Sequence, residues 1–470
     1  MITGPSFEEM LHPQTIEPSL RAAAVAALDE DPLSPLNLYN ITWRDPQDQV
    51  YHIVLPPELT GVAAPIVVLY GGRFPSGSHK VGAAYSVLLE EQLRGDVDPA
   101  AHTLVWPSTG NYGIGGAFIG CRMEYDSIVV LPEEMSQERF DLIARYGARV
   151  IRTAGSESNV KEIYDEVKRL RESDSKIRVL NQFEVMGNYR FHYHVTGNTL
   201  VELAAELAAA GIGDGRISAY VSAMGSAGAI AAGDRLKQVW PEHKIVGLEP
   251  IQCPTLFNNG YGAHEIQGIG DKHVTWIHNV FNMDALMAID DRDALNGLRV
   301  LAEAAGRKVL IERFGLAEDM VAQLAETLGI SGVCNIIGAI KTAKFYELSE
   351  KDVVATVATD AFERYLSVMQ DLRTAGGALD EAGATAIIEG VFRRAGLDWI
   401  MEGGRAARER WHNLKYYTWV EQQGKSVAEL DAQRDPAWWL GQQAQVAEID
   451  KRLLAQRAAN QAIERLNVRR

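Results

Sequence analysis

The chain has 470 residues, of which 47% are hydrophobic and 23% charged, a composition typical of globular proteins. At about 150 residues per domain, this length predicts two or three domains. The formal net charge of −16 argues against a nucleic-acid partner, because phosphate binding relies on Lys and Arg side chains. The N-terminus is acidic where a signal peptide would be basic, and no apolar run reaches membrane-spanning length. We therefore expect a cytoplasmic protein with no membrane partner.

No metal site or disulfide framework is expected. Cys121, Cys253 and Cys334 are isolated in sequence, so they give neither a disulfide pattern nor zinc-ligand spacing. We interpret them as small buried residues in a reducing compartment. His192 and His194 are two residues apart and have no evident third ligand, which favours a structural role for both.

Short β-branched apolar runs alternate with amphipathic segments from about residue 64 onward. The pattern predicts strands over 65–70, 102–106, 127–131 and 148–152, with helices after Lys80 and over 137–146. It resumes after residue 210 with strands over 216–221, 244–249 and 353–358. This alternation is typical of an α/β protein with parallel strands covered by helices on both faces.

Four parts are expected along the chain. Residues 1–63 form an N-terminal segment packed on the core, 64–205 a smaller α/β domain and 206–365 a larger α/β domain. Residues 366–470 form a helical C-terminal extension, which holds five of the nine tryptophans. Its last stretch places Val446, Ile449 and Leu453 on one helical face, with Ile463 and Leu466 further along.

The first turn that indicates chemistry ends in Lys80, between a predicted strand and a predicted helix. Ligands of open α/β sheets bind at the carboxyl ends of strands, where this lysine lies. A neutral lysine amine forms a Schiff base with an aldehyde cofactor, and a helix N-terminus favours the uncharged amine. An isolated lysine in a Gly/Ser-rich turn is usually a solvated surface residue.

A second turn of the same kind spans 108–113 and reads STGNYG. Its backbone amides can bind a carboxylate, and the Asn111 side chain can donate a hydrogen bond to a phenolic oxygen. An ordinary strand-to-helix turn with a capping hydroxyl is an equally good interpretation of this stretch alone. The crowded glycines lack the G-x-G-x-x-G order of a dinucleotide site, so a dinucleotide-dependent enzyme is disfavoured.

The third turn spans 222–229 and consists of small residues between a strand and a helix. Small residues let backbone N–H groups close on a phosphate at a helix start, although close helix–strand packing also requires them. The G-K-[ST] ending of a P-loop is absent.

Three such turns in this order, with a lysine in the first, resemble the cysteine synthase and cystathionine β-synthase family of pyridoxal-phosphate enzymes. This family has the tryptophan synthase β-like fold, also called fold type II. The resemblance extends over about residues 65–365, and its further motifs are LPEEMSQER at 131–139, Gln182-Phe183, EIQGIG at 265–270 and GISGVCNII at 329–337. It implies two three-layer α/β domains with pyridoxal 5'-phosphate between them, and a homodimer.

The resemblance also assigns roles to individual residues. Lys80 would hold the cofactor covalently and act as the base at the substrate α-carbon, and Asn111 would bond the cofactor's ring oxygen. The cofactor phosphate would lie in a loop formed by Gly225, Ser226, Ala227, Gly228 and Ala229. The substrate would be bound by Ser108, Thr109, Gly110, Asn111, Tyr112 and Gln182, with Gly268 at the mouth of the site.

Two candidates exist for the group that faces the cofactor's ring nitrogen. The family places a serine before E-R-Y-L, and here that stretch begins with Thr359-Asp360. Counting back from Tyr365 puts Asp360 at the serine position, whereas Thr359 is the nearest hydroxyl. A hydroxyl would leave the ring nitrogen unprotonated and suit β-elimination, and a carboxylate would protonate it and widen the range of reactions. We prefer Thr359, and Asp360 can also be interpreted as a helix cap.

The implied activity is β-replacement or β-elimination on a small β-substituted L-amino acid such as O-acetylserine, cysteine or serine. The alternatives are a cysteine desulfhydrase and a serine, threonine or diaminopropionate ammonia-lyase. A catalytically inactive binding or scaffold protein is a hypothesis from a different class. Lys80 is followed by Val81-Gly82 where the family usually has Asp-Arg, and the His79-Lys80 pair is similar to the tryptophan synthase β form.

Overall fold

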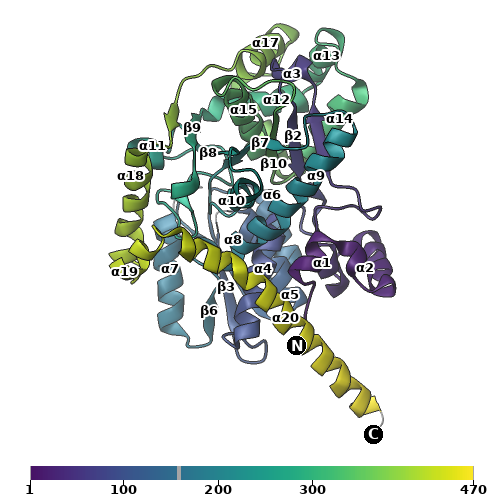
Figure 1. Ribbon diagram of the computed structural model, residues 1–470, viewed down its shortest axis with the longest axis vertical. Coiled ribbons are helices and arrows are strands. Elements are labelled where there is room, and N and C mark those ends of the chain that lie inside the picture. The colour runs from purple at the N-terminus through teal and green to yellow at the C-terminus, as the bar shows by residue number, and fades with distance from the viewer. Residues whose placement is uncertain (1, 109, 156–159, 469–470) are drawn as a thin grey trace.

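The computed structural model describes residues 2–108, 110–155 and 160–468, and two sheets organise them (Figure 1). The larger sheet has seven strands, in the order β1 (His52–Leu55), β2 (Ile66–Tyr70), β10 (Val353–Ala358), β7 (Ile217–Ala223), β8 (Lys244–Pro250), β9 (Ala285–Ile289) and β11 (Ile400–Glu402). The five inner strands are parallel, and the edge strands β1 and β11 are antiparallel to their neighbours.

The smaller sheet has four parallel strands, in the order β5 (Arg149–Thr153), β4 (Asp126–Pro132), β3 (Thr103–Pro107) and β6 (Ile177–Val179). All seven predicted strands are present, each within two residues of its expected bounds. The structure adds β1, β6, β9 and β11, which sequence analysis did not predict.

Helices cover both sheets. Those of the N-terminal half are α1 (Phe7–Leu11), α2 (Pro18–Glu30), α3 (Pro57–Thr60), α4 (Lys80–Arg94), α5 (Asn111–Arg122), α6 (Gln137–Tyr146), α7 (Val160–Ser173), α8 (Met186–Phe191) and α9 (Gly197–Ala209). The larger unit adds α10 (Ala231–Val239), α11 (Thr255–Asn258), α12 (Asp291–Ala302), α13 (Ala304–Glu312), α14 (Glu318–Thr327) and α15 (Ile330–Phe345). The C-terminal part consists mainly of α16 (Leu366–Gly376), α17 (Glu381–Ile387), α18 (Arg405–Lys415), α19 (Val427–Ala432) and α20 (Pro436–Val468).

The boundary expected at residue 64 differs from the sheet assignment. Strand β2 was expected in the smaller unit, but it pairs in parallel with β10 in the larger sheet. A single apolar strand does not indicate which of two sheets it joins, because the partner strand here lies nearly 290 residues away along the chain.

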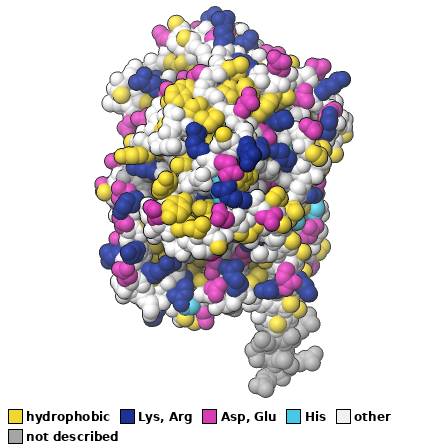
Figure 2. All heavy atoms as spheres, turned by 60° about the vertical axis from the view of Figure 1, so that its left-hand side comes forward, with side chains coloured by type: hydrophobic (Ala, Val, Ile, Leu, Met, Phe, Trp, Pro, Cys, Tyr) yellow, Lys and Arg dark blue, Asp and Glu magenta, His cyan; other side chains and the backbone are white. Residues whose placement is uncertain are grey.

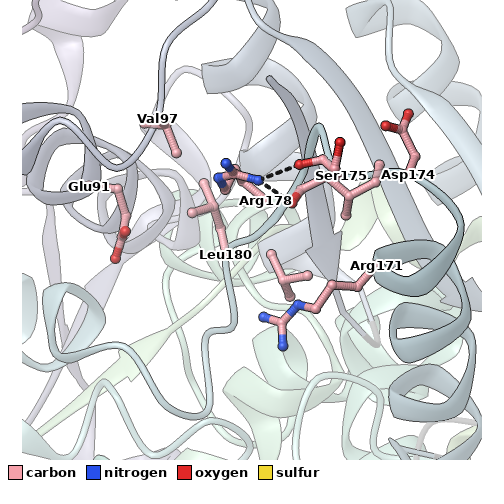
Figure 3. Close-up of a pocket in the computed structure, with 9 residues that line it drawn as sticks. Glu91, Val97, Arg171, Asp174, Ser175, Arg178 and Leu180 are labelled. Atoms are coloured by element: carbon pink, nitrogen blue, oxygen red, sulfur yellow. Dashed lines mark hydrogen bonds between the residues drawn. The ribbon is translucent and has the colours of Figure 1, made fainter. Parts of the chain in front are cut away.

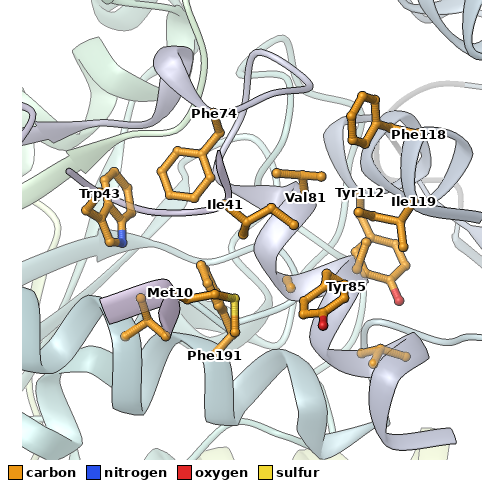
Figure 4. Close-up of a cluster of buried hydrophobic side chains, with 14 of the residues drawn as sticks. Met10, Ile41, Trp43, Phe74, Val81, Tyr85, Tyr112, Phe118, Ile119 and Phe191 are labelled. Atoms are coloured by element: carbon orange, nitrogen blue, oxygen red, sulfur yellow. The ribbon is translucent and has the colours of Figure 1, made fainter. Parts of the chain in front are cut away.

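The N-terminal segment packs on the helices beside the predicted lysine turn (Figure 4). Met10, Ile41 and Trp43 are buried in one hydrophobic cluster with Val81 of α4 and Phe191 of α8. This packing fixes the start of α4, where Lys80 is the first residue.

The C-terminal part is helical, as expected, and α20 runs across the body and extends beyond it (Figure 1). The predicted apolar face of α20 is confirmed, since Val446 and Leu453 are buried and Ile449 packs against the same cluster. The side chains of Ile463 and Leu466 lie outside the described residues.

Charged side chains of both signs are intermingled with apolar ones on the face drawn in Figure 2. Among the described residues, no single helix is long and apolar enough to cross a membrane. Helices α14 and α15 meet that criterion only as a pair, which is bent by 118°.

Candidate functional site

Lys80 lies where the two predicted α/β units meet. It opens α4, and its Nζ donates a hydrogen bond of 2.9 Å to Ser226 Oγ, in the loop between β7 and α10. Two of the three turns singled out in the sequence, 146 residues apart, are therefore in direct contact.

The small-residue loop from Gly225 to Ala229 is held from two sides. Asn188 Nδ2 donates to Ser226 Oγ at 3.0 Å, and Thr275 Oγ1 donates to the Ser226 carbonyl at 3.0 Å. Ala227 has a φ of 57°, a left-handed conformation that non-glycine residues seldom adopt. A Cβ at position 228 would overlap Asn188 Oδ1. Glycine at this position therefore lets the loop backbone lie against the Asn188 side chain.

The asparagine loop is shaped by its own serine. Ser108 Oγ accepts hydrogen bonds from the backbone N–H groups of Gly110, at 2.9 Å, and Gly113, at 2.8 Å. Asn111, the first residue of α5, is buried. The Tyr112 side chain points into the core and donates to the Leu180 carbonyl at 3.1 Å, so only its backbone is available to a substrate. Thr109 lies outside the described residues.

Gln182 and Gly268 border the same region. Gln182 is buried, and its carbonyl accepts a 2.9 Å hydrogen bond from Asn188 Nδ2, which also reaches Ser226. Gly268 has a φ of 95°, and its carbonyl lies 2.8 Å from where a Cβ on Gly225 would stand. The turn at 265–270 therefore packs against the small-residue loop.

Thr359 and Asp360 point to different partners. Thr359 Oγ1 lies 3.3 Å from Nε2 of His79. Asp360 is fully buried, and its Oδ2 accepts hydrogen bonds from Asn111 Nδ2, at 2.6 Å, and from the Tyr365 hydroxyl, at 2.8 Å. A backbone bridge between Ser78 and Asp360 joins this carboxylate to the lysine turn.

His79 is neutral at physiological pH. Burial, followed by the positive charge of Lys80, lowers the pKa of His79 to about 3. Its ring packs against Trp43, at 5.5 Å between ring centroids, and against His192, at 5.0 Å. His192 in turn bonds Thr196 Oγ1 at 3.0 Å, in keeping with the structural role expected for it.

Two large cavities lie away from these residues. One, of about 390 Å³, opens beside β6 and is lined by Arg171, Asp174 and Arg178 among others (Figure 3). Another, of about 790 Å³, lies between α7 and the C-terminal extension. Neither is lined by Lys80, Asn111 or Ser226.

Several residues that build the site were given no role in the sequence analysis. Arg364 donates to Asn111 Oδ1 and to the Ser76 carbonyl, and Tyr365 binds Asp360. These two residues belong to the E-R-Y-L motif, so the motif could have indicated them. Thr275 lies in an irregular loop with no sequence signal.

A family model described as "Pyridoxal-phosphate dependent enzyme" matches residues 58–312, which is more than half of the chain. The chain belongs to this family. Pyridoxal phosphate is accordingly the cofactor of this pyridoxal-phosphate enzyme, as the resemblance in its sequence implied.

Similar proteins of known name indicate which branch of the family this chain resembles. The pyridoxal-phosphate enzyme is 30% identical over 294 residues to a probable cysteine synthase of Bacillus subtilis, covering 62% of this chain and 85% of the relative. It is also 30% identical over 307 residues to a cysteine synthase of Staphylococcus aureus, covering 65% and 88%. The expected family, cysteine synthase-like and of fold type II, is confirmed.

Solved structures confirm the fold. The O-acetylserine dependent cystathionine β-synthase of Helicobacter pylori aligns with a TM-score of 0.56 and 25% identity, over 67% of this chain and 94% of that one. The O-acetylserine sulfhydrylase isoform 3 of Entamoeba histolytica aligns with a TM-score of 0.61, over 77% and 96%. At 22% identity, the latter supports the fold alone.

The residues of the site fit pyridoxal phosphate. The Gly225–Ala229 stretch offers backbone N–H groups and the Ser226 hydroxyl to a phosphate, next to the Lys80 amine. Two buried oxygens, Asn188 Oδ1 and Asp360 Oδ1, have no hydrogen-bond partner among the described residues. Buried polar atoms normally have partners, so donors from a bound group would suit this region.

Proposed function

We propose that this pyridoxal-phosphate enzyme catalyses β-replacement or β-elimination on a small β-substituted L-amino acid, such as O-acetylserine, cysteine or serine. The observation that carries the proposal is the contact between Lys80 Nζ and Ser226 Oγ, which brings a reactive amine to a phosphate-type loop. The relatives named cysteine synthase support this reaction class.

Lys80 would perform two tasks. Its amine would bond the cofactor aldehyde, and, once a substrate amine has taken its place, it would remove the proton from the substrate α-carbon. Pyridoxal phosphate, when bound, withdraws the electrons that this proton leaves behind. Lys80 is the first residue of α4, so both tasks would take place at the N-terminal end of this helix.

The cofactor would be anchored at its phosphate and at its ring. Gly225, Ser226, Ala227, Gly228 and Ala229 would bind the phosphate, since this loop leads into α10 and exposes backbone N–H groups. Asn111 would donate to the ring oxygen. Arg364 orients this side chain by donating a hydrogen bond to Asn111 Oδ1. Asn111 Nδ2 is then the donor, and one of its two hydrogens is bonded to Asp360.

The substrate carboxylate would bind at the asparagine loop. Ser108 Oγ already accepts the backbone N–H groups of Gly110 and Gly113, so its side chain would shape the loop. The backbone N–H groups of Asn111 and Tyr112, at the start of α5, would face the carboxylate. Gln182 would donate a further hydrogen bond, and Gly268 would border the entrance. The homodimer and the cytoplasmic location expected from the sequence are part of the same proposal.

Products distinguish replacement from elimination. Purified enzyme loaded with pyridoxal phosphate is supplied with O-acetylserine plus sulfide, and separately with cysteine, serine or threonine alone. Cysteine formed from the first mixture identifies a synthase. Ammonia with pyruvate or oxobutyrate from a single amino acid identifies a lyase, and sulfide released from cysteine identifies a desulfhydrase.

Lys80→Ala should lower the rate of product formation about a thousand-fold or more, because removing a positioned base costs rates of this order. Lys308→Ala is the control, since this exposed lysine pairs with Glu312 and Glu381 on the surface of α13 and α17, and it should keep the wild-type rate. Full activity in Lys80→Ala, or no product from any of these mixtures, would contradict the proposal.

A further inference from the structure

Two polar side chains follow strand β10 next to the lysine turn, and they have different partners. The hydroxyl of Thr359 faces His79 Nε2 at 3.3 Å, in the buried cluster of His79, Trp43 and His192 behind Lys80. The Thr359 backbone carbonyl packs against Gly71, 2.9 Å from where a Cβ on that glycine would stand. Thr359 therefore supports the histidine.

Asp360 points the other way, toward Asn111. Its Oδ2 is held at 2.6 Å by Asn111 Nδ2 and at 2.8 Å by the Tyr365 hydroxyl. Its Oδ1 has no hydrogen-bond partner among the described residues, although Asp360 is fully buried. A Cβ at position 329 would overlap this oxygen, so glycine at that position leaves room for the carboxylate.

Positive groups surround the Asp360 carboxylate. Gly329 is the residue that precedes α15, a helix of 16 residues, so the carboxylate lies at a positive helix N-terminus. Arg139 is 3.4 Å from the Tyr365 hydroxyl that binds Asp360, and Arg364 donates to the Asn111 side chain that binds it. Both guanidinium groups are buried. Each contacts a side chain that itself binds the Asp360 carboxylate.

We propose that Asp360, and not Thr359, faces the ring nitrogen of pyridoxal phosphate and accepts a hydrogen bond from it, so that the bound ring is protonated. This inference rests on the proposed function, because it takes Lys80 and the Gly225–Ala229 loop as the cofactor site. The Asp360 carboxylate accepts this hydrogen bond, and the ring nitrogen holds a proton taken from solvent. Serine stands at this position in the family that the sequence resembles, so the ionic pair distinguishes this chain.

The protonation state of the ring can be measured without turnover. The full-length enzyme is loaded with pyridoxal phosphate carrying ¹⁵N in the ring, and the nitrogen resonance is recorded by solid-state NMR at pH 7 to 8. Wild type should give the resonance of a protonated pyridine ring. Asp360→Ser, which restores the serine of the family, should give that of an unprotonated ring, and so should Asp360→Asn.

Thr359→Val is the matched control, because it removes the hydroxyl while keeping the shape of the side chain. It should keep the protonated resonance of wild type. An unprotonated ring in wild type would overturn the inference, and so would a protonated ring in Asp360→Ser or loss of protonation in Thr359→Val.

A second measurement uses wild type alone, in case the aspartate variants fail to fold. Affinity for 1-deazapyridoxal phosphate, which carries carbon in place of the ring nitrogen, is compared with affinity for pyridoxal phosphate. Loss of a charged hydrogen bond predicts at least roughly ten-fold weaker binding of the analogue. Equal affinity would overturn the assignment of Asp360. Failure of wild type to bind pyridoxal phosphate at all would instead overturn the proposed function, and this inference with it.

Discussion

Adding a single carbon atom at Gly228 tests whether the small-residue loop binds the cofactor phosphate. A Cβ at this position would overlap Asn188 Oδ1, and Asn188 also holds Ser226, so Gly228→Ala has to displace the loop. We expect the affinity for pyridoxal phosphate to fall by roughly 5- to 150-fold, since overpacking of this kind costs about 1–3 kcal/mol. This affinity is measured by titrating the protein with pyridoxal phosphate and following the visible absorption of the bound cofactor.

Gly376→Ala provides the comparison. A Cβ there would meet nothing within 4 Å, and the residue is the exposed last residue of α16. Its cofactor affinity should equal that of wild type. Equal affinity in Gly228→Ala as well would show that the loop does not hold the phosphate.

Glu249, at the end of β8, links stability to pH. Burial raises its pKa to about 7 from 4.5, although the backbone N–H groups of Leu256 and Phe257 oppose the shift. Between pH 4.5 and 7 the folded chain therefore holds a proton that the unfolded chain releases, so this group makes the free energy of unfolding decrease as pH rises. Glu249→Gln removes the dependence.

Urea unfolding of wild type and Glu249→Gln at several pH values measures this effect. The stability of wild type relative to the variant should fall by at most about 3 kcal/mol from pH 4.5 to 8, given about 1.4 kcal/mol for each unit of pKa shift. Glu350→Gln, on an exposed loop, should run parallel to wild type. Parallel curves for Glu249→Gln would show that Glu249 titrates normally.

Individual site residues were predictable where one local motif carries them. Lys80, Asn111 and Ser226 each lie in a strand-to-helix turn that is visible in the sequence. The partners of Thr359 and Asp360 were not predictable, because His79 and Asn111 each lie about 250 residues or more away in the chain. Whether Tyr112 faces the substrate or the core depends in the same way on packing.

Among the elements, the C-terminal extension has an identifiable structural task. Lys415, the last residue of α18, is fully buried and donates to the carbonyls of Trp276 and His278 and to Gln433 Oε1, at 3.1, 2.6 and 2.6 Å. The loop that Lys415 binds also contains Thr275, whose hydroxyl donates to the Ser226 carbonyl of the small-residue loop. The extension thus supports the proposed cofactor site from outside the matched family region.

Lys415→Met should destabilise the protein by about 3 kcal/mol, because it leaves buried carbonyl groups without a donor. It should also weaken cofactor binding, since the loop that carries Thr275 loses its anchor. Lys451→Met, on the exposed face of α20, should stay within about 0.5 kcal/mol of wild type. Unfolding curves and cofactor titrations measure both effects, and a neutral Lys415→Met would contradict the supporting role.

Strands were predictable where the local sequence is a distinct apolar run. The seven expected strands are apolar runs, six of them rich in Val and Ile, bounded by turns. Strand β9 reads ALMAI, whose Ala, Leu and Met suit a helix equally well, and β6 has only three residues. The antiparallel edge strands β1 and β11 depend on partners far away in sequence.

On the scale of the whole molecule, the extension links the smaller α/β unit to the N-terminal segment. Helix α20 receives hydrogen bonds from Arg190 of α8, on the side of the smaller sheet, through Gln442 and Gln445. Its Asp450 accepts the N–H groups of Phe7 and Glu8 at the start of α1. The extension was predictable as a separate helical part, but its contacts depend on the three-dimensional arrangement.

The central claim is that Lys80 holds the cofactor between the two units. Full-length enzyme is incubated with pyridoxal phosphate, reduced with borohydride to fix any covalent bond, digested and analysed by mass spectrometry. We expect the mass of the reduced cofactor on the peptide that contains Lys80. The label on another lysine, or no label after reduction, would contradict it.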